Sequence, residues 1–273
     1  MSFVRLGAAQ GLSQDSAMSI VQDQSGFLWL GTEDGLNRYD GVEIKRIVHS
    51  RSDPGSLPSN YISALAVDQR GRMWVGTDTG SLAWRDAVSG AFRPPLAASG
   101  QMLVDPNIQL RSIYVDRRQR LWLATRDSGL ILVDAAAGTT REFRRDLTDS
   151  KSLSDDSVFS VTEDSSGQIW VATGSGLDRL DPESASFERY GARLRQLAGS
   201  GKTAVRVNTV YVDSHGTIWA GSETGLFRLD IPSASLTLLR HNAADEHSLP
   251  GDRVTALIED NERRLWEIGR AHV

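Results

Sequence analysis

Tryptophan returns along this chain at an almost constant interval, and that interval limits the possible folds more than any other feature. Six tryptophans stand 45 to 49 residues apart, each within a similar stretch of sequence: Trp29, Trp74, Trp122, Trp170, Trp219 and Trp266. Repeats of about 40 to 50 residues with four short strands each are typical of β-propeller blades. The tryptophan period therefore predicts an all-β repeat protein.

Each repeat is expected to form a small antiparallel meander. In the first repeat an apolar run ends in Asp23-x-x-Gly26, a tight-turn signature in which glycine supplies the positive φ angle. The next strand carries Trp29, and a turn that ends in Gly35 leads to a third strand. Because these runs alternate between apolar and polar residues and end at Gly, Asp or Ser, helical solenoids are disfavoured. The fourth and fifth repeats contain the corresponding residues Asp164, Gly167, Trp170 and Gly176, and Asp213, Gly216, Trp219 and Gly225.

The repeats predict a β-propeller of four-stranded blades, with five complete blades and a partial sixth. A further fourth strand is expected at Phe3–Leu6, ahead of the first full repeat, so the ring is predicted to be incomplete. The complete blades are expected at 18–49, 62–93, 109–146, 158–191 and 206–241, and the partial blade from 253.

The repeated tryptophans are interpreted as plugs between neighbouring blades. A single blade cannot bury both of its faces, so its neighbours must cover them. The alternative is an aromatic platform for sugars, which requires exposed rings. The residues predicted to be buried are Trp29, Trp74, Trp122, Trp170 and Trp219.

Composition narrows the possible partners and compartments. The net charge of −5 and the pI near 5.6 argue against a nucleic-acid-binding protein, which normally presents a basic face. The chain contains no cysteine, which excludes disulfides and thiolate metal sites. No apolar run reaches the roughly 18 residues of a transmembrane helix, and the first residues lack the pattern of a secretory signal.

The sequence contains no recognisable catalytic constellation. The five histidines show no His-x-x-x-His pairing. Residues 199–203, Gly-Ser-Gly-Lys-Thr, are similar to the end of a phosphate-binding P-loop, but Gln196 stands where that motif needs its first glycine. The residues before it are polar or helical in character, so we interpret 199–203 as a loop between blades. We therefore expect no enzymatic activity, no metal and no cofactor.

The repeat resembles that of the two-component regulator propeller family. Its pattern is apolar-x-x-Asp-x-x-Gly-x-apolar-Trp-apolar-Gly-Thr-x-x-Gly-Leu-x-Arg-apolar-Asp, and Thr32–Gly41 follows the family especially closely. Phe3–Leu6, followed by Gly11-Leu12-Ser13, is similar to the usual start of that family. The resemblance covers residues 3 to about 266.

This resemblance implies an extracytoplasmic, ligand-sensing part of a bacterial transmembrane receptor. In the family, a small β-sandwich, a membrane helix and a histidine kinase or diguanylate cyclase follow the propeller. The implied location is the periplasmic face of the inner membrane, with membrane attachment through other parts of the receptor and a homodimeric full receptor. A protein-interaction scaffold is the alternative, which would expose large apolar patches, and a lyase or hydrolase propeller is a third.

Ligand contacts are expected from loops, since loops on a rigid scaffold carry function. The loops between blades share a phrase at 53–58, 149–153 and 245–250, which we interpret as a structural clamp. The polar residues that enter each first strand are better candidates, and their arginines suit a small anionic molecule or an acidic oligosaccharide. These candidates are Asn60, Tyr61, Asn107, Arg111, Asp156, Arg206, Asn208, Asp252 and Arg253, together with Arg126 and Glu223 on the turns between second and third strands.

The last seven residues do not continue the repeat. After Trp266 the pattern requires an apolar residue, then Gly or Ala, then Thr, whereas the chain reads Glu267-Ile268-Gly269. Residues 267–273 are similar to the translated start of a sequencing-library adapter. They are interpreted as a non-native tail, which leaves 1–266 as the propeller sensor region. A divergent sixth blade is the alternative.

Overall fold

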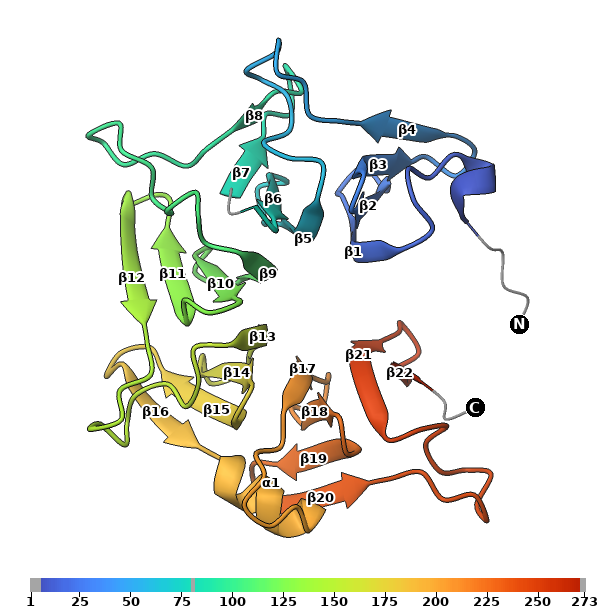
Figure 1. The fold of residues 1–273 in the computed structure, drawn as a ribbon, viewed down its shortest axis with the longest axis vertical. Coiled ribbons are helices and arrows are strands. Elements are labelled where there is room, and N and C mark those ends of the chain that lie inside the picture. Colours follow the sequence, from blue (N-terminus) through green and yellow to red (C-terminus); the bar gives the residue numbers. More distant parts are fainter. Residues whose placement is uncertain (1–5, 80–81, 271–273) are drawn as a thin grey trace. The chain divides into compact units, whose positions relative to one another are not determined.

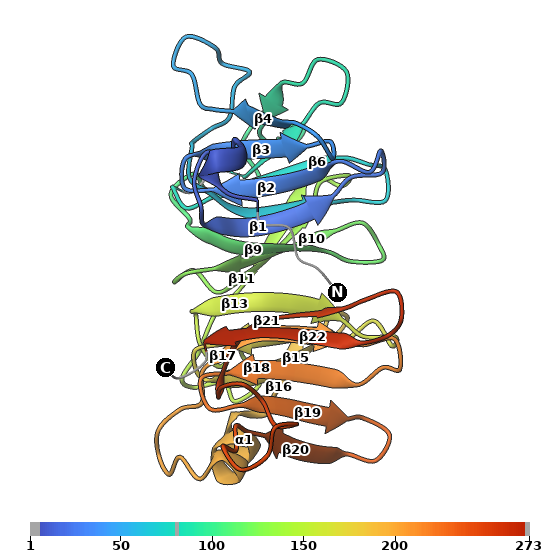
Figure 2. The same ribbon diagram turned by 90° about the vertical axis from the view of Figure 1, so that its right-hand side faces the viewer.

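The computed structural model describes residues 6–79 and 82–270, and within them the protein consists almost entirely of antiparallel sheets (Figure 1). The chain divides into two compact units, one of residues 1–126 and 131–142 and the other of residues 127–130 and 143–273. Each four-stranded sheet is a meander with its strands in chain order. Figure 2 shows this for β1 to β4 and for β17 to β20.

The sheets coincide with the predicted blades. Three lie along the first half of the chain: β1 (Ala17–Gln22), β2 (Leu28–Thr32), β3 (Gly35–Tyr39) and β4 (Ile44–Ile47); β5 (Ile62–Val67), β6 (Met73–Thr77), β7 (Leu82–Arg85) and β8 (Phe92–Arg93); and β9 (Leu110–Val115), β10 (Leu121–Thr125), β11 (Leu130–Asp134) and β12 (Thr139–Phe143). A short 3-10 helix, Ala8–Gln10, precedes them.

The second half follows the same plan. Its sheets are β13 (Val158–Glu163), β14 (Ile169–Thr173), β15 (Gly176–Asp181) and β16 (Ser186–Arg189); β17 (Val207–Val212), β18 (Ile218–Ser222), β19 (Leu226–Asp230) and β20 (Ser235–Leu239); and the pair β21 (Arg253–Glu259) and β22 (Leu265–Arg270). One α-helix, α1 (Gly191–Ala198), stands between β16 and β17. The prediction of four-stranded propeller blades is confirmed.

Two expectations concern the ends of the chain. The strand predicted at Phe3–Leu6 falls mostly on residues 1–5, outside the described residues. The segment interpreted as a tail continues β22 up to Arg270 and pairs with β21, with Glu267 opposite Leu257 and Gly269 opposite Val254. Residues 271–273 lie outside the described residues.

The first turn of each repeat is shaped by its aspartate. Oδ1 of Asp23 accepts hydrogen bonds from the backbone N–H groups of Ser25 and Phe27, at 2.9 and 3.1 Å. Its Oδ2 accepts a bond of 2.7 Å from Nε1 of Trp29. The aspartate therefore does more than the turn chemistry assigned to it, because it also fixes the orientation of the indole.

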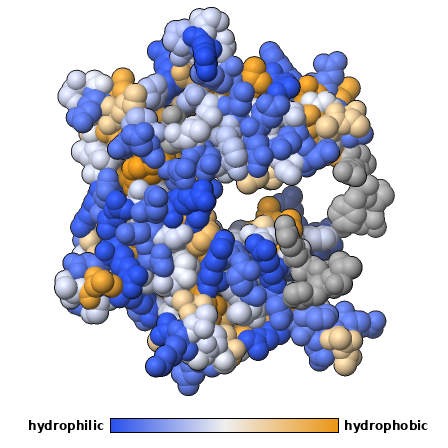
Figure 3. Space-filling view, in the orientation of Figure 1, coloured by the Kyte–Doolittle hydropathy of each residue, from blue (hydrophilic) through white to orange (hydrophobic). Residues whose placement is uncertain are grey.

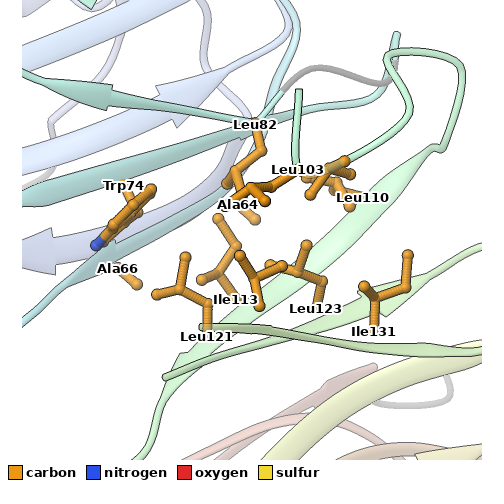
Figure 4. Packing of buried hydrophobic residues seen from close by; sticks show 12 residues of the cluster. Ala64, Ala66, Trp74, Leu82, Leu103, Leu110, Ile113, Leu121, Leu123 and Ile131 are labelled. Carbon is orange, nitrogen blue, oxygen red and sulfur yellow. The ribbon is translucent and has the colours of Figure 1, made fainter. Parts of the chain in front are cut away.

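Three of the tryptophans pack against the sheet that follows them in the chain. Trp29 belongs to a buried cluster with Leu65 and Val75 of the second sheet, and Trp170 to one with Val210 and Leu229 of the fifth. In the same way Trp74 joins Leu121, Leu123 and Ile131 of the third sheet (Figure 4). These contacts support the interpretation of the tryptophans as plugs.

One tryptophan departs from that prediction. Trp29, Trp74, Trp122 and Trp170 are buried, whereas Trp219 is half-exposed. The sheet that follows Trp219 contains two strands, β21 and β22, where the others contain four. The expectation that all five rings are buried is therefore wrong for Trp219, because fewer side chains cover it.

The sequence segment that recurs between blades forms hydrogen bonds that close each loop. In the first unit, Oγ of Ser56 accepts a bond from Ser50 N at 2.9 Å and donates to Ser50 O at 3.0 Å. In the second unit, Ser152 makes the same two bonds with Asp146, and Ser248 makes them with Asn242. These bonds support the structural-clamp interpretation.

The segment that is similar to a P-loop lacks the context of one. Helix α1 ends at Ala198 and is capped by Gly199, whose backbone is left-handed with φ 66°, and β17 is the next regular element. A P-loop requires the opposite order, with a strand before the glycine-rich turn and a helix after it. The interpretation of 199–203 as a loop is confirmed.

Candidate ligand-binding surface

The sequence candidates converge at one end of each sheet. There the turn between second and third strands meets the residue that precedes the first strand of the same sheet. In the first unit Asp78 N donates to Tyr61 O at 3.3 Å, and in the second unit Glu223 N donates to Arg206 O at 3.4 Å. These backbone bonds hold the two loop series against each other, so a side chain from each is presented together.

The second unit contains the densest cluster of candidates. Glu223 lies 3.9 Å from Nε of Arg206 and 3.2 Å from Nε of Arg253, and all three side chains are partly exposed. The contact with Arg253 is an ion pair without hydrogen-bond geometry, since that Nε has no hydrogen-bond partner. The guanidinium carbon of Arg206 also lies 4.2 Å from the ring centre of Phe159.

This cluster has an excess of positive charge. Two guanidinium groups share one carboxylate, and each retains N–H groups able to bind a second anion. The Phe159 ring fixes the position of one of them. The arrangement therefore suits an anionic group, as the sequence predicted for these arginines.

A corresponding pair lies in the first unit. The hydroxyl of Tyr61 donates to Oε1 of Glu33 at 3.4 Å. Partial burial, followed by the charges of Glu33 and Asp78, raises the pKa of Tyr61, so the phenol stays protonated and remains a donor. Arg126 lies at the next turn and donates from Nη1 to Oε1 of Gln109 at 3.2 Å.

Three candidates have a further role. Asn60, Asp156 and Asp252 each accept, through Oδ1, a hydrogen bond of 2.7 Å from a backbone N–H eleven residues earlier. The donors are His49, Arg145 and His241. These side chains therefore complete the clamps between blades, in addition to lying where ligand contact is predicted.

The remaining candidates lie outside these clusters. Asn107 bonds to Oδ1 of Asp105 through its backbone N–H and its side chain. Arg111 is half-exposed on β9. Asn208 donates to the carbonyl of Val254 at 3.0 Å and thereby joins β17 to β21. Among the described residues, neither Asn107 nor Asn208 bonds to Glu223 or Glu33.

Sequence reasoning missed Glu33 and Phe159. Glu33 and Glu223 occupy the same position of the repeat, directly after the second strand. Tyr61 and Arg253 also occupy equivalent positions, at the start of the following sheet. Aligning the repeats on these positions would have added Glu33 to the candidates. Phe159 had no such signal, because it lies within β13 and reaches Arg206 only through the packing of β13 beside β17.

Metal-ligating clusters, apolar helices and exposed apolar side chains are the other features that bear on function. In the described part of the chain, no group of three or more His, Asp or Glu side chains is arranged to hold a metal ion. No helix among residues 6–79 and 82–270 is long and apolar enough to span a bilayer. The face in Figure 3 carries mostly hydrophilic side chains, with hydrophobic ones scattered among them.

Comparison with known proteins agrees with the repeat pattern. Residues 11–34, 56–79 and 152–175 match the family described as two component regulator propeller. A segment of 47 residues is 47% identical to histidine kinase P4 of Formosa agariphila, which is 17% of this chain and 3% of the kinase.

Solved structures share the fold at low identity. The extracellular domain assigned to a hybrid two component system of B. thetaiotaomicron superposes with a TM-score of 0.68 and 18% identity. The extracellular domain assigned to a one component system of the same organism superposes with a TM-score of 0.56 and 19% identity. The alignments cover 97% and 93% of this chain but only 40% and 37% of those chains. The chain therefore contains three segments that match the two-component regulator propeller family, within a β-propeller fold that it shares with these extracellular domains.

Proposed function

We propose that this chain is a ligand-sensing, extracytoplasmic part of a bacterial transmembrane signalling receptor. The family match, the kinase segment and the extracellular neighbours support this role. The output module is a histidine kinase or a diguanylate cyclase, the propeller lies on the periplasmic side, and the full receptor is a homodimer. The chain binds its ligand without converting it.

The ligand is a small anionic molecule or an acidic oligosaccharide. The observation that carries this proposal is the sharing of Glu223 by Arg206 and Arg253. Guanidinium groups bind carboxylates and sulfates through paired N–H bonds, so the excess charge selects acidic over neutral ligands. A sensor then works only if the ligand binds one receptor conformation more tightly than another.

Calorimetric titration of the chain with uronic-acid oligosaccharides and with neutral oligosaccharides of equal length tests this proposal. Acidic ligands should bind and neutral ones should not. Arg206→Gln and Arg253→Gln should each weaken binding about ten-fold or more, the loss expected for one charge-assisted hydrogen bond. Arg228→Gln is the matched control, because Arg228 is an exposed arginine of the same unit that stacks on Trp219. Equal binding of both ligand classes, or unchanged affinity in the two variants, would show that the cluster is not the site.

A further inference from the structure

A second group of arginines lies in the first unit, at the opposite end of strand β2 from Glu33. A groove of about 380 Å³ opens there between the first and second sheets. Asp23, Phe27 and Trp29 line it from the first sheet, and Arg85 lines it from the second. Arg38 and Arg70 also border this groove, which we call the Arg38–Arg85 groove.

Arg85 occupies a position that holds leucine in the fourth and fifth sheets and tyrosine in the first. It pairs with Met73, as Leu180 pairs with Ile169 and as Leu229 pairs with Ile218. Leu229 packs in the buried cluster of Trp170, the tryptophan of the preceding sheet. Arg85 instead places its guanidinium carbon 5.3 Å from the ring centre of Trp29. A charged group thus stands where the fourth and fifth sheets place a leucine.

A second arginine lies in the same groove. The guanidinium carbon of Arg38 is 4.5 Å from the ring centre of Phe27. Arg38 pairs with Trp29 in the sheet register, as Arg179 pairs with Trp170 in the fourth sheet. Arg179 has a carboxylate partner, Glu188, at 3.7 Å. Arg38 has no carboxylate at ion-pair distance in the described structure. The charged side chain that shares its groove is Arg85, which carries the same charge.

Neither arginine forms an ion pair within the described residues, and Asp40 acts on Arg38 only through a longer-range electrostatic attraction. The Nε atom of each arginine is buried without a hydrogen-bond acceptor. Asp23 borders the groove and Asp86 lies nearby, and both charges favour the protonated form of Arg85. The oxygens of Asp23 are already occupied by Trp29 Nε1 and by two backbone N–H groups.

Partial burial of two neighbouring guanidinium groups raises the free energy of the folded chain. Burial, followed by the like charge of Arg38, lowers the pKa of Arg85. A buried guanidinium N–H without an acceptor also loses its hydrogen bonds to water without replacement. An anion between the two arginines removes both costs at once.

We propose that the Arg38–Arg85 groove binds an oxyanion, namely a carboxylate, sulfate or phosphate group, between the two guanidinium groups. Stacking on Phe27 and Trp29 holds the guanidinium planes in place, so little side-chain freedom is lost on binding. The exposed Arg70 at the rim adds a third positive charge. This site shares no residue with the Arg206–Glu223–Arg253 cluster and does not depend on the proposed sensing function.

Thermal unfolding of the complete chain tests this site, with inorganic phosphate, sulfate and glucuronate as probes and chloride at equal ionic strength as the reference. The decisive variant is Arg85→Leu, which introduces the residue found at 180 and 229. It should fold, unfold at a higher temperature than the parent without added oxyanion, and bind the probes at least about ten-fold more weakly. Arg38→Gln should show the same loss of binding.

Arg179→Gln is the matched control, because Arg179 has the same register but a carboxylate partner, and it should keep the response to the probes. If glucuronate binds more tightly than phosphate and sulfate, the oxyanion is carried on a sugar, and the reverse order indicates a free ion. The proposal is overturned if the parent responds no more to oxyanions than to chloride, or if Arg85→Leu responds as the parent does. Binding of uronic-acid oligosaccharides at Arg206 and Arg253 should survive Arg85→Leu, which separates the two proposals.

Discussion

The carboxylate of Asp164 links a turn to the buried indole of Trp170 through both of its oxygens. Oδ2 accepts a bond of 2.8 Å from Trp170 Nε1, and Oδ1 accepts backbone bonds from Ser166 and Gln168. The residue that follows the first strand thus also orients the side chain that packs on the next sheet. Corresponding bonds of 2.7 to 3.2 Å join Asp23 to Trp29, Asp68 to Trp74, Asp116 to Trp122, Asp213 to Trp219 and Asp260 to Trp266.

Replacing Asp164 should therefore destabilise the second unit strongly. Asp164→Ala removes three hydrogen bonds and leaves a buried indole N–H without an acceptor, which we expect to cost about 2–4 kcal/mol. Urea unfolding followed by tryptophan fluorescence measures the loss. Asp260→Ala is the control, because Trp266 is exposed and water can replace the lost acceptor. If both variants lost the same unfolding free energy, burial of the indole would not be what makes the aspartate bond important.

The tryptophans should differ in their contribution to stability. Trp170 is fully buried against the fifth sheet, so Trp170→Ala should cost about 3–5 kcal/mol. Trp219 is half-exposed, and Trp219→Ala should cost clearly less. Chemical denaturation of both variants provides the comparison. If Trp219→Ala lost more unfolding free energy than Trp170→Ala, the exposure of a ring would not determine its contribution to stability.

Asp178 should make stability depend on pH. It is buried on β15, and burial raises its pKa from 3.8 to about 6, against the lowering effect of the Ser154 bonds. Because the folded form holds its proton more tightly than the unfolded form, the folded state is favoured at pH 4. This advantage is lost as pH rises through about 6, by about 2–4 kcal/mol in total.

The matched variant is Asp178→Asn. Asn37 stands in the same register of the first sheet, where Oδ1 accepts from Ser13 N and Nδ2 donates to Leu30 O. The variant should be more stable than the parent at pH 7 and lose that advantage at pH 4, as thermal unfolding across this range can measure. An unchanged difference between parent and variant from pH 4 to 7 would contradict the raised pKa.

The blade boundaries could be predicted because the tryptophan period and the Asp-x-x-Gly turns are local signals. The clamp roles of Asn60, Asp156 and Asp252 could not be assigned so easily. Asn and Asp both offer an Oδ1 acceptor, and the donor N–H is eleven residues away across a loop. From the sequence alone the loop-closing role of these residues was therefore not apparent.

Long-range packing was the main source of error and omission. The exposure of Trp219 depends on how many strands follow it, and the contact of Phe159 with Arg206 depends on two neighbouring sheets. The position of Arg85 at a leucine site became visible only in the strand register. Such features require knowing which sheet lies beside which.

The most direct test of the sensing account is the affinity of Glu223→Gln for uronic-acid oligosaccharides, measured by calorimetry beside Arg253→Gln. Glu223 neutralises part of the charge of Arg206 and Arg253 and competes with an anionic ligand for both. The account predicts tighter binding in Glu223→Gln and weaker binding in Arg253→Gln, with both variants folded as the parent by circular dichroism. Unchanged or weaker binding in Glu223→Gln would contradict it.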